Sequence, residues 1–185
     1  MRDREFEVKL ELTNEEAVFI KEKLNGQIKR PSSCQIDRYY CPEGTDSRKY
    51  MQEKCLRIRT QDGEVTLDYK EIISQHDIYM QQLIEYSTII ADAQIMDAIL
   101  NQIGMRHILS VTKRRQEYIV DSIFKIALDY VEQLGFFLEI ELLDETKFSE
   151  NWVTNIIKEL NISEIRINRM GYSNMLLDLQ KEELE

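Results

Sequence analysis

The stretch Glu5-Phe6-Glu7-Val8-Lys9 alternates charged with bulky apolar side chains. Successive side chains of a β-strand point to opposite faces of the sheet, so a strand here places Glu5, Glu7 and Lys9 on one face. An isolated strand of this kind is typical of an antiparallel sheet whose polar face lies in water. The charged face therefore indicates a functional site only if other strands repeat the alternation with complementary charges.

The rest of the chain repeats this strand pattern several times. Strands are predicted over residues 3–12, 35–41, 54–60, 64–72, 79–87, 107–120, 124–131 and 136–142. Asp62-Gly63 is a hairpin signal. Helices are predicted from a capping box at Thr13 to Asn25-Gly26, and over 91–103, 149–160 and 172–181, with a polar loop over 42–50.

The helices are too few and too irregularly placed for a parallel βαβ sheet. The sequence therefore predicts an α+β fold: an antiparallel eight-stranded closed barrel or tunnel with a charged interior and helices packed outside.

The composition limits the classes of protein that the chain can represent. Its 185 residues suit a single domain over 1–185, and 43% hydrophobic residues indicate a globular protein. A net charge of −10 argues against a nucleic-acid binder. Neither a signal peptide nor a run of ~18 apolar residues is present, so no membrane association is expected. Three cysteines without metal-ligand or CxxC spacing favour a reduced, cytoplasmic protein.

One face of the predicted barrel gathers charges of both signs. Each charged group taken singly also suits a solvated surface; these groups are the pair Arg57 and Arg59, the run Lys113-Arg114-Arg115, and the pair Glu139 and Glu141. Dry burial of many charges costs several kcal/mol per ion, so a charged interior must be wet and must bind a ligand or pair internally. With the charged face inward, the interior collects the acids Glu5, Glu7, Glu85, Asp129, Glu139 and Glu141 and the bases Lys9, Arg57, Arg59, Lys70, Lys113 and Arg115.

The chemistry of these groups indicates a metal–polyphosphate ligand. Arg and Lys on neighbouring strands suit phosphate oxygens, because the guanidinium fork matches their geometry. Carboxylates at i and i+2 on two strands supply the oxygen ligands that Mg²⁺ or Mn²⁺ prefers. His76 and His107 lie outside the charged positions and are expected to be ordinary surface or strand histidines, with no metal-binding or catalytic role.

Several motifs in order resemble the CYTH superfamily of triphosphate tunnel enzymes, and they extend over most of the chain. The first is the Glu5-x-Glu7-x-Lys9 signature. The others are Gln35-x-Asp37-x-Tyr39-Tyr40, Leu56-Arg57-Ile58-Arg59, Leu67-Asp68-Tyr69-Lys70-Glu71, Lys113-Arg114-Arg115, Asp129-x-Val131 and Leu134-Gly135-Phe136-Phe137-Leu138-Glu139-Ile140-Glu141.

This resemblance implies a role for each charged residue. Glu5, Glu7, Glu139 and Glu141 would hold Mg²⁺ or Mn²⁺. Lys9 and Asp129 would be catalytic, with Asp129 or a metal-bound hydroxide accepting the proton. The substrate would be bound by Lys9, Arg57, Arg59, Lys70, Lys113 and Arg115, supported by Glu85.

The resemblance also implies alternative reactions. The Gln-x-Asp-x-Tyr-Tyr and Leu-Asp-Tyr-Lys segments are more similar to the class IV adenylyl cyclases, which convert ATP to cyclic AMP and pyrophosphate. The second alternative is a triphosphatase acting on inorganic, thiamine or nucleoside triphosphate, although Tyr172 to Leu179 has no basic residue and Lys181 is the only candidate in that helix. The third is a module that binds a polyphosphate or nucleotide without turning it over. The expected partner is a triphosphate-containing small molecule, and exposed apolar faces would also allow a homodimer.

Overall fold

The computed structural model describes residues 5–77, 80–149, 151–162 and 166–182, without the side chains of Glu5, 74–82, Glu145 and Glu182. The strands are β1 (Glu5–Leu12), β2 (Ile28–Lys29), β3 (Ser33–Pro42), β4 (Lys54–Gln61), β5 (Glu64–Asp77), β6 (Met80–Ile89), β7 (Met105–Val120), β8 (Phe124–Val131) and β9 (Gly135–Leu142). The helices are α1 (Asn14–Lys23), α2 (Ser47–Glu53), α3 (Ala93–Gln102), α4 (Trp152–Leu160) and α5 (Tyr172–Glu182), with a 3₁₀ turn at Glu145–Lys147.

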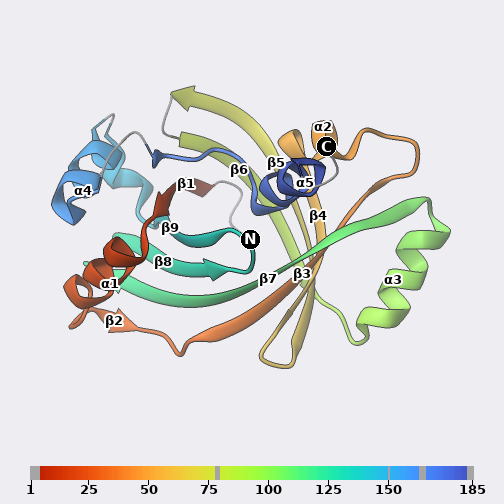
Figure 1. The fold of residues 1–185 in the computed structure, drawn as a ribbon, viewed down its shortest axis with the longest axis horizontal. Coiled ribbons are helices and arrows are strands. Elements are labelled where there is room, and N and C mark those ends of the chain that lie inside the picture. The colour runs from red at the N-terminus through yellow and green to blue at the C-terminus, as the bar shows by residue number, and fades with distance from the viewer. Residues whose placement is uncertain (1–4, 78–79, 150, 163–165, 183–185) are drawn as a thin grey trace.

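Strand pairing forms a closed circuit. The order is β7-β3-β4-β5-β6-β1-β9-β8, and β8 pairs again with β7, while the short β2 adds to β7. Every one of these pairings is antiparallel. The prediction of an eight-stranded antiparallel barrel with helices outside is confirmed (Figure 1).

In two of the hairpins the strands are connected by a tight turn whose residues have positive φ. Asp62 and Gly63 have φ of 50° and 89°, which is the arrangement that matches the right-handed twist of the flanking strands β4 and β5. Asp121 and Ser122, with φ of 51° and 59°, join β7 to β8 in the same way. The hairpin predicted at Asp62-Gly63 is therefore confirmed.

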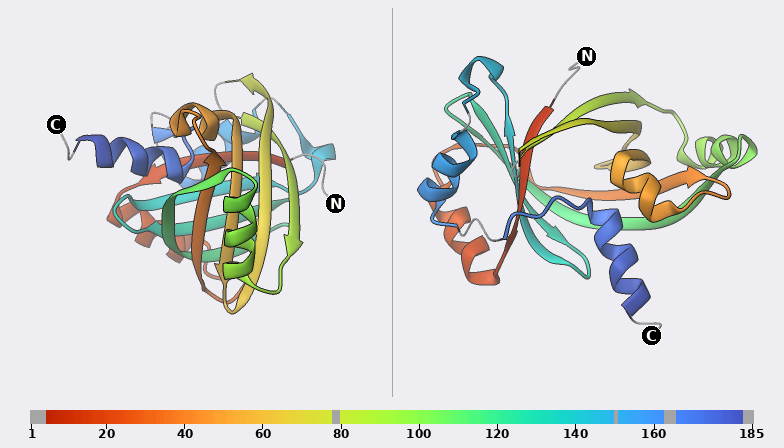
Figure 2. Two further views of the ribbon diagram at one scale, coloured as in Figure 1. Left: turned by 90° about the vertical axis from the view of Figure 1, so that its right-hand side faces the viewer. Right: turned by 90° about the horizontal axis from the view of Figure 1, so that it is seen from above.

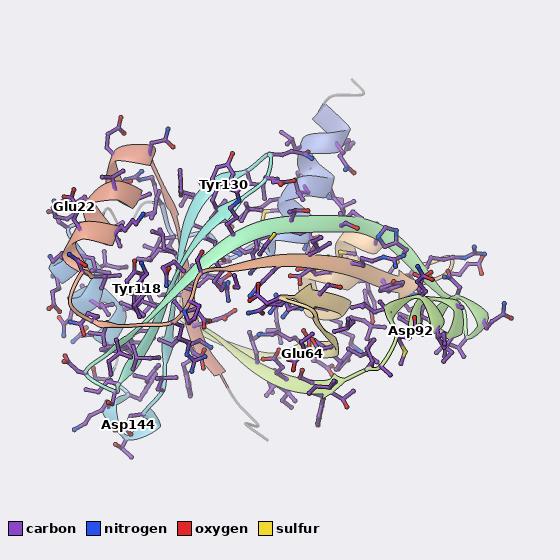
Figure 3. All side chains as sticks on the ribbon, turned by 90° about the horizontal axis from the view of Figure 1, so that it is seen from below. Glu22, Glu64, Asp92, Tyr118, Tyr130 and Asp144 are labelled. Atoms are coloured by element: carbon purple, nitrogen blue, oxygen red, sulfur yellow. The ribbon has the colours of Figure 1, made fainter. Side chains whose placement is uncertain are left out.

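The largest apolar core lies outside the barrel, under two helices. The alternate residues that face away from the charges, such as Val8, Ile126 and Ile140, pack against α1 and α4. Both helices lie on the same side of the sheet (Figures 1 and 2), and Tyr118 of β7 lies on that side as well (Figure 3). The predicted capping box starts α1, because Thr13 and Glu16 exchange side-chain to backbone hydrogen bonds.

A second apolar cluster covers the outer face at the other end of the barrel. Leu100 of α3 packs on Tyr40 and Ile58, which are fully buried. The outward stripe of α3, at Ile95 and Ile103, is exposed. No helix in the described ranges is long and apolar enough to cross a membrane. The homodimer stays a prediction.

The prediction of a polar loop over residues 42–50 is wrong in its second half, because α2 begins at Ser47. Asp46 caps this helix by accepting hydrogen bonds from the backbone N–H groups of Arg48 and Lys49. Only Met51 of α2 is buried, so the sequence has no amphipathic stripe to reveal the helix. Helices α2 and α5 contact each other and form a third cluster at one end of the tunnel (Figure 2).

Candidate active site in a charged tunnel

The barrel encloses a cavity of about 570 Å³. All eight strands of the closed circuit contribute to its wall, together with α2 and the segment that leads into α5. Among the described residues the acids in this wall are Glu7, Glu53, Glu71, Glu85, Glu117, Glu139 and Glu141. The bases are Lys9, Arg30, Lys54, Arg57, Arg59, Lys70, Lys113, Arg115, Lys125 and Arg169. Three further acids, Asp37, Asp68 and Asp129, lie behind this wall and pair with its arginines, so acids and bases are balanced among the described residues of the site.

Two buried aspartates fix the arginines of β4. The Nε and Nη2 atoms of Arg59 donate to the two oxygens of Asp37 at 2.6 and 2.7 Å. Arg57 donates through Nε to Asp68 at 3.0 Å and lies 3.5 Å from Asp37, and Ser87 donates to the other Asp68 oxygen at 2.6 Å. Burial raises the pKa of Asp37, but Arg57 and Arg59 outweigh it and hold this pKa well below its usual range. The guanidinium groups are therefore oriented before any ligand binds.

Lys70 and Glu85 face each other across β5 and β6. Their side chains pair at 3.1 Å, and Glu85 also lies 3.9 Å from Arg57. The two side chains are about one-fifth exposed to the cavity, at 20% and 21%. Glu85 therefore lies between Lys70 and Arg57, and its supporting role in substrate binding stays a prediction.

Asp129 is the centre of a second cluster and is fully buried. It accepts hydrogen bonds from Arg115 Nε and Nη2 at 2.7 and 2.6 Å, from Lys113 Nζ at 3.3 Å and from the Tyr172 hydroxyl at 3.0 Å. Arg115 also pairs with Glu139. Burial raises the pKa of Asp129, but Arg115 and then Lys113 outweigh it, so the pKa is lower than usual. Asp129 is therefore an ionised carboxylate that orients two cations.

The ring of Tyr172 supports two lysines at once. Lys9 Nζ lies 4.6 Å from the ring centroid and Lys113 Nζ lies 5.1 Å from it, within the range of cation–π attraction. Lys9 also donates to the backbone oxygen of Met170 and stands opposite Glu139. Burial lowers the pKa of both lysines, and that of Lys113 to about 8. The start of α5 therefore belongs to the site.

The carboxylates predicted to hold a metal lie along β1 and β9. Glu7 and Glu141 are opposed in the register of these strands, and Lys125 of β8 pairs with Glu141. Glu5 is two residues along β1 from Glu7, and its side chain lies outside the described residues. In the described part of the chain no group of three His, Cys, Asp or Glu side chains is gathered for a metal. The opposed carboxylates have the oxygen chemistry of a Mg²⁺ or Mn²⁺ site, so the donor set fits such an ion.

The structure brings together all the predicted site residues whose side chains it describes, and it adds some that the prediction missed. Asp68 and Lys125 were detectable, because they share a strand face with the predicted residues Lys70 and Asp129, whereas the strand of Asp37 carries no predicted site residue. Tyr172 and Arg169 had no such signal, because they lie outside the sheet. The side chain of His76 is not described, and His107 lies on the outer surface, as predicted, 3.1 Å from Ser110.

The fold and the site define a class of protein: closed antiparallel tunnels whose interior consists of ion-paired acids and bases. The model of the CYTH domain matches residues 3–171, so the chain belongs to the CYTH family. A search of curated proteins found no match.

Solved structures share this fold over nearly the whole chain. The PH1819 protein from Pyrococcus horikoshii OT3 is 28% identical, with a TM-score of 0.75, covering 94% of this chain and 98% of that one. A candidate adenylate cyclase from Vibrio parahaemolyticus is 18% identical, with a TM-score of 0.68, covering 95% and 99%. A candidate adenylyl cyclase from Hippeastrum, HpAC1, described with a dominant triphosphatase activity, is 14% identical, with a TM-score of 0.66, covering 87% and 89%.

Proposed function

We propose that this protein is a metal-dependent enzyme that acts on a triphosphate. The observation that carries the proposal is the set of lysines and arginines that line the cavity of an acidic chain. Arg57, Arg59 and Arg115 are held by buried aspartates, so their geometry is fixed in advance. Preorganised cations of this kind stabilise the charge that develops on phosphate oxygens more effectively than mobile ones.

The reaction that we propose is the conversion of ATP to cyclic AMP and pyrophosphate. A cavity of about 570 Å³ lies in the range of pockets that enclose a whole organic ligand, which favours a nucleotide over an inorganic triphosphate. The CYTH motifs that resemble class IV cyclases and the similarity to the Vibrio parahaemolyticus protein support the same reaction.

In this reaction the ribose 3′-oxygen forms a bond to the α-phosphorus while the bond from that phosphorus to the bridging oxygen breaks. Lys9, Lys113 and Arg115 would stabilise the negative charge on the leaving pyrophosphate. Glu5, Glu7, Glu139 and Glu141 would hold a Mg²⁺ or Mn²⁺ ion, which supplies charge neutralisation and acidifies the attacking hydroxyl.

The geometry refines the role proposed for Asp129. Both of its oxygens accept hydrogen bonds and its pKa is lowered, so it is a weak base. We therefore assign it the orientation of Arg115 and Lys113. The 3′-proton then leaves to water.

A triphosphatase is the second candidate, and the similarity to the Hippeastrum protein favours it. The same bases would hold the triphosphate, but a water molecule would attack the terminal phosphorus and release orthophosphate. The two reactions differ in which phosphorus meets the nucleophile.

The proposed setting is the cytoplasm, with a triphosphate-containing small molecule as partner. The free thiols of Cys34, Cys41 and Cys55 support a reducing compartment. The acidic net charge of −10 argues against nucleic acid as the partner.

A product assay tests this proposal. Purified protein is incubated with ATP or tripolyphosphate and Mg²⁺ or Mn²⁺, and the products are separated by chromatography. Cyclic AMP with pyrophosphate supports the cyclase, whereas orthophosphate from either substrate supports the triphosphatase. Tight ATP binding without product would contradict both reactions. Glu7→Gln should abolish turnover, and the exposed Glu15→Gln serves as the matched control.

A further inference from the structure

Three charged side chains form a row across strands β1, β9 and β8 in the wall of the tunnel. In the antiparallel register Glu7 of β1 stands opposite Glu141 of β9, and Glu141 stands opposite Lys125 of β8. All three line the cavity. The next row along the same strands is Lys9, Glu139 and Ala127, so the β8 position beside Glu139 carries no charge. A lysine is therefore placed beside one particular carboxylate.

Lys125 supplies the positive charge of this row. Like charges directly opposed on neighbouring strands are destabilising, and Glu7 and Glu141 form such a pair. The side chain of Glu141 is only 8% exposed, so it interacts more strongly with a neighbouring positive charge than a surface carboxylate would. Lys125 is ion-paired to Glu141 and its side chain is 27% exposed. Its ammonium group can therefore leave Glu141 for the water of the cavity.

We propose that Lys125 is a built-in counter-ion that competes with the divalent cation for Glu141. In the metal-free protein its ammonium group neutralises Glu141, and metal binding displaces it. The lysine thereby sets the metal concentration at which the site fills, since metal binding must break the ion pair. This inference rests on the proposed function for the metal-binding role of Glu7 and Glu141.

A different role for Lys125 makes different predictions. If Lys125 were one more phosphate-binding cation, its removal would weaken tripolyphosphate binding and leave metal affinity unchanged. If it competes with the metal, its removal strengthens metal binding. A neighbouring positive charge lowers the pKa of a carboxylate by about 1–3 units, which means that it weakens proton binding tenfold or more. We expect a similar effect on metal binding, so removal of Lys125 should lower the dissociation constant for Mn²⁺ about tenfold.

Direct Mn²⁺ titration separates these outcomes without any turnover. Free Mn²⁺ is measured by electron paramagnetic resonance while the ion is added to wild type, Lys125→Gln, Lys125→Arg and Lys158→Gln. The Gln variant at position 125 should bind Mn²⁺ about tenfold more tightly. Lys125→Arg keeps the charge and should match wild type. Lys158 is exposed on α4, so its Gln variant controls for net charge and should also match wild type. Equal or weaker Mn²⁺ binding by Lys125→Gln overturns the inference.

A measurement on the wild-type protein covers the case in which Lys125→Gln does not fold. Lysines are acetylated briefly with and without Mn²⁺, and labelling is quantified by mass spectrometry. Labelling of Lys125 should rise when Mn²⁺ is bound, because the amine is released from Glu141, while labelling of Lys158 stays constant. Unchanged labelling of Lys125 with Mn²⁺ bound overturns the inference. Absence of Mn²⁺ binding by wild type would instead contradict the metal dependence under the proposed function.

Discussion

Asp37→Asn is the substitution whose consequence can be worked out most directly from the structure. Asp37 is fully buried. Its two oxygens accept hydrogen bonds from Nε and Nη2 of Arg59 at 2.6 and 2.7 Å, and it lies 3.5 Å from Arg57. The amide keeps the shape of the side chain but removes its charge and one of its two acceptors. Two guanidinium groups then face each other without this counter-ion.

The expected loss of stability is large. Removing one partner of a buried ion pair costs about 3–5 kcal/mol. In a protein of this size, 1 kcal/mol changes Tm by about 2–4 °C, so we expect a decrease of about 6–20 °C. Tripolyphosphate should recover part of this loss, because its oxygens replace the missing charge beside Arg57 and Arg59. The anion-induced rise in Tm should therefore be larger in the variant than in wild type.

Thermal and urea unfolding with and without tripolyphosphate measure these quantities. Asp97→Asn is the matched control, since Asp97 accepts from Arg38 at 2.8 Å and Tyr40 at 2.6 Å on the outer face. Its loss of stability should be smaller, and its response to tripolyphosphate should equal that of wild type. A loss below about 1 kcal/mol for Asp37→Asn, the value of an ordinary hydrogen bond, would refute the reasoning.

The stability difference between wild type and Asp37→Asn should depend on pH in a definite direction. The pKa of Asp37 is lower in the folded protein than its unfolded value of about 3.9, so the carboxylate stabilises the fold above that pH. Its contribution is lost as the pH falls through the folded pKa. The difference in stability between wild type and Asp37→Asn should therefore narrow in acid.

Other predictions concern the tunnel and one turn. Tyr172→Phe loses the hydrogen bond to Asp129 and should raise the KM for triphosphate a few-fold, whereas Tyr172→Leu also loses both cation–π contacts and should raise it by about tenfold or more, as steady-state kinetics would show. Because the pKa of Lys113 is about 8, tripolyphosphate affinity measured by calorimetry should fall about tenfold from pH 7 to 9, and Lys113→Arg should remove most of this fall. Gly63→Ala at φ +89° should cost about 1–2 kcal/mol in urea unfolding; an unchanged midpoint would contradict the assigned turn.

Strand alternation was sufficient to predict the barrel and much of its interior. Glu7, Arg57 and Lys113 lie on separate strands, yet each faces the cavity as its position in the alternation requires. The period of two fixes the face of every residue once one face is known to be buried. The same argument could have placed Asp68 inside, because it is two residues from Lys70.

The partners of the charges could not be predicted from the sequence. Arg115 binds Asp129 and Glu139, and Lys125 binds Glu141, because the register of β7, β8 and β9 brings them together. Register depends on pairing between distant segments, which alternation within one strand does not specify. Tyr172 was missed for a related reason: it reaches the tunnel from a helix far along the chain.

The long strand β7 has a consequence for how the chain folds. Residues 113–115 pair with β3 along one edge and with β8 along the other, so they join the two parts of the barrel. Pairings between distant segments, such as Gln35 with Lys113 and Glu7 with Glu141, raise the contact order and slow folding. Arg115 and Asp129 already face each other in the local β7–β8 hairpin, whereas Arg59 and Lys9 join them only through the long-range pairings of β3 with β7 and of β1 with β9. The complete set of tunnel cations is therefore brought together only when the ring closes, and a chain that has not closed its ring has no complete tunnel.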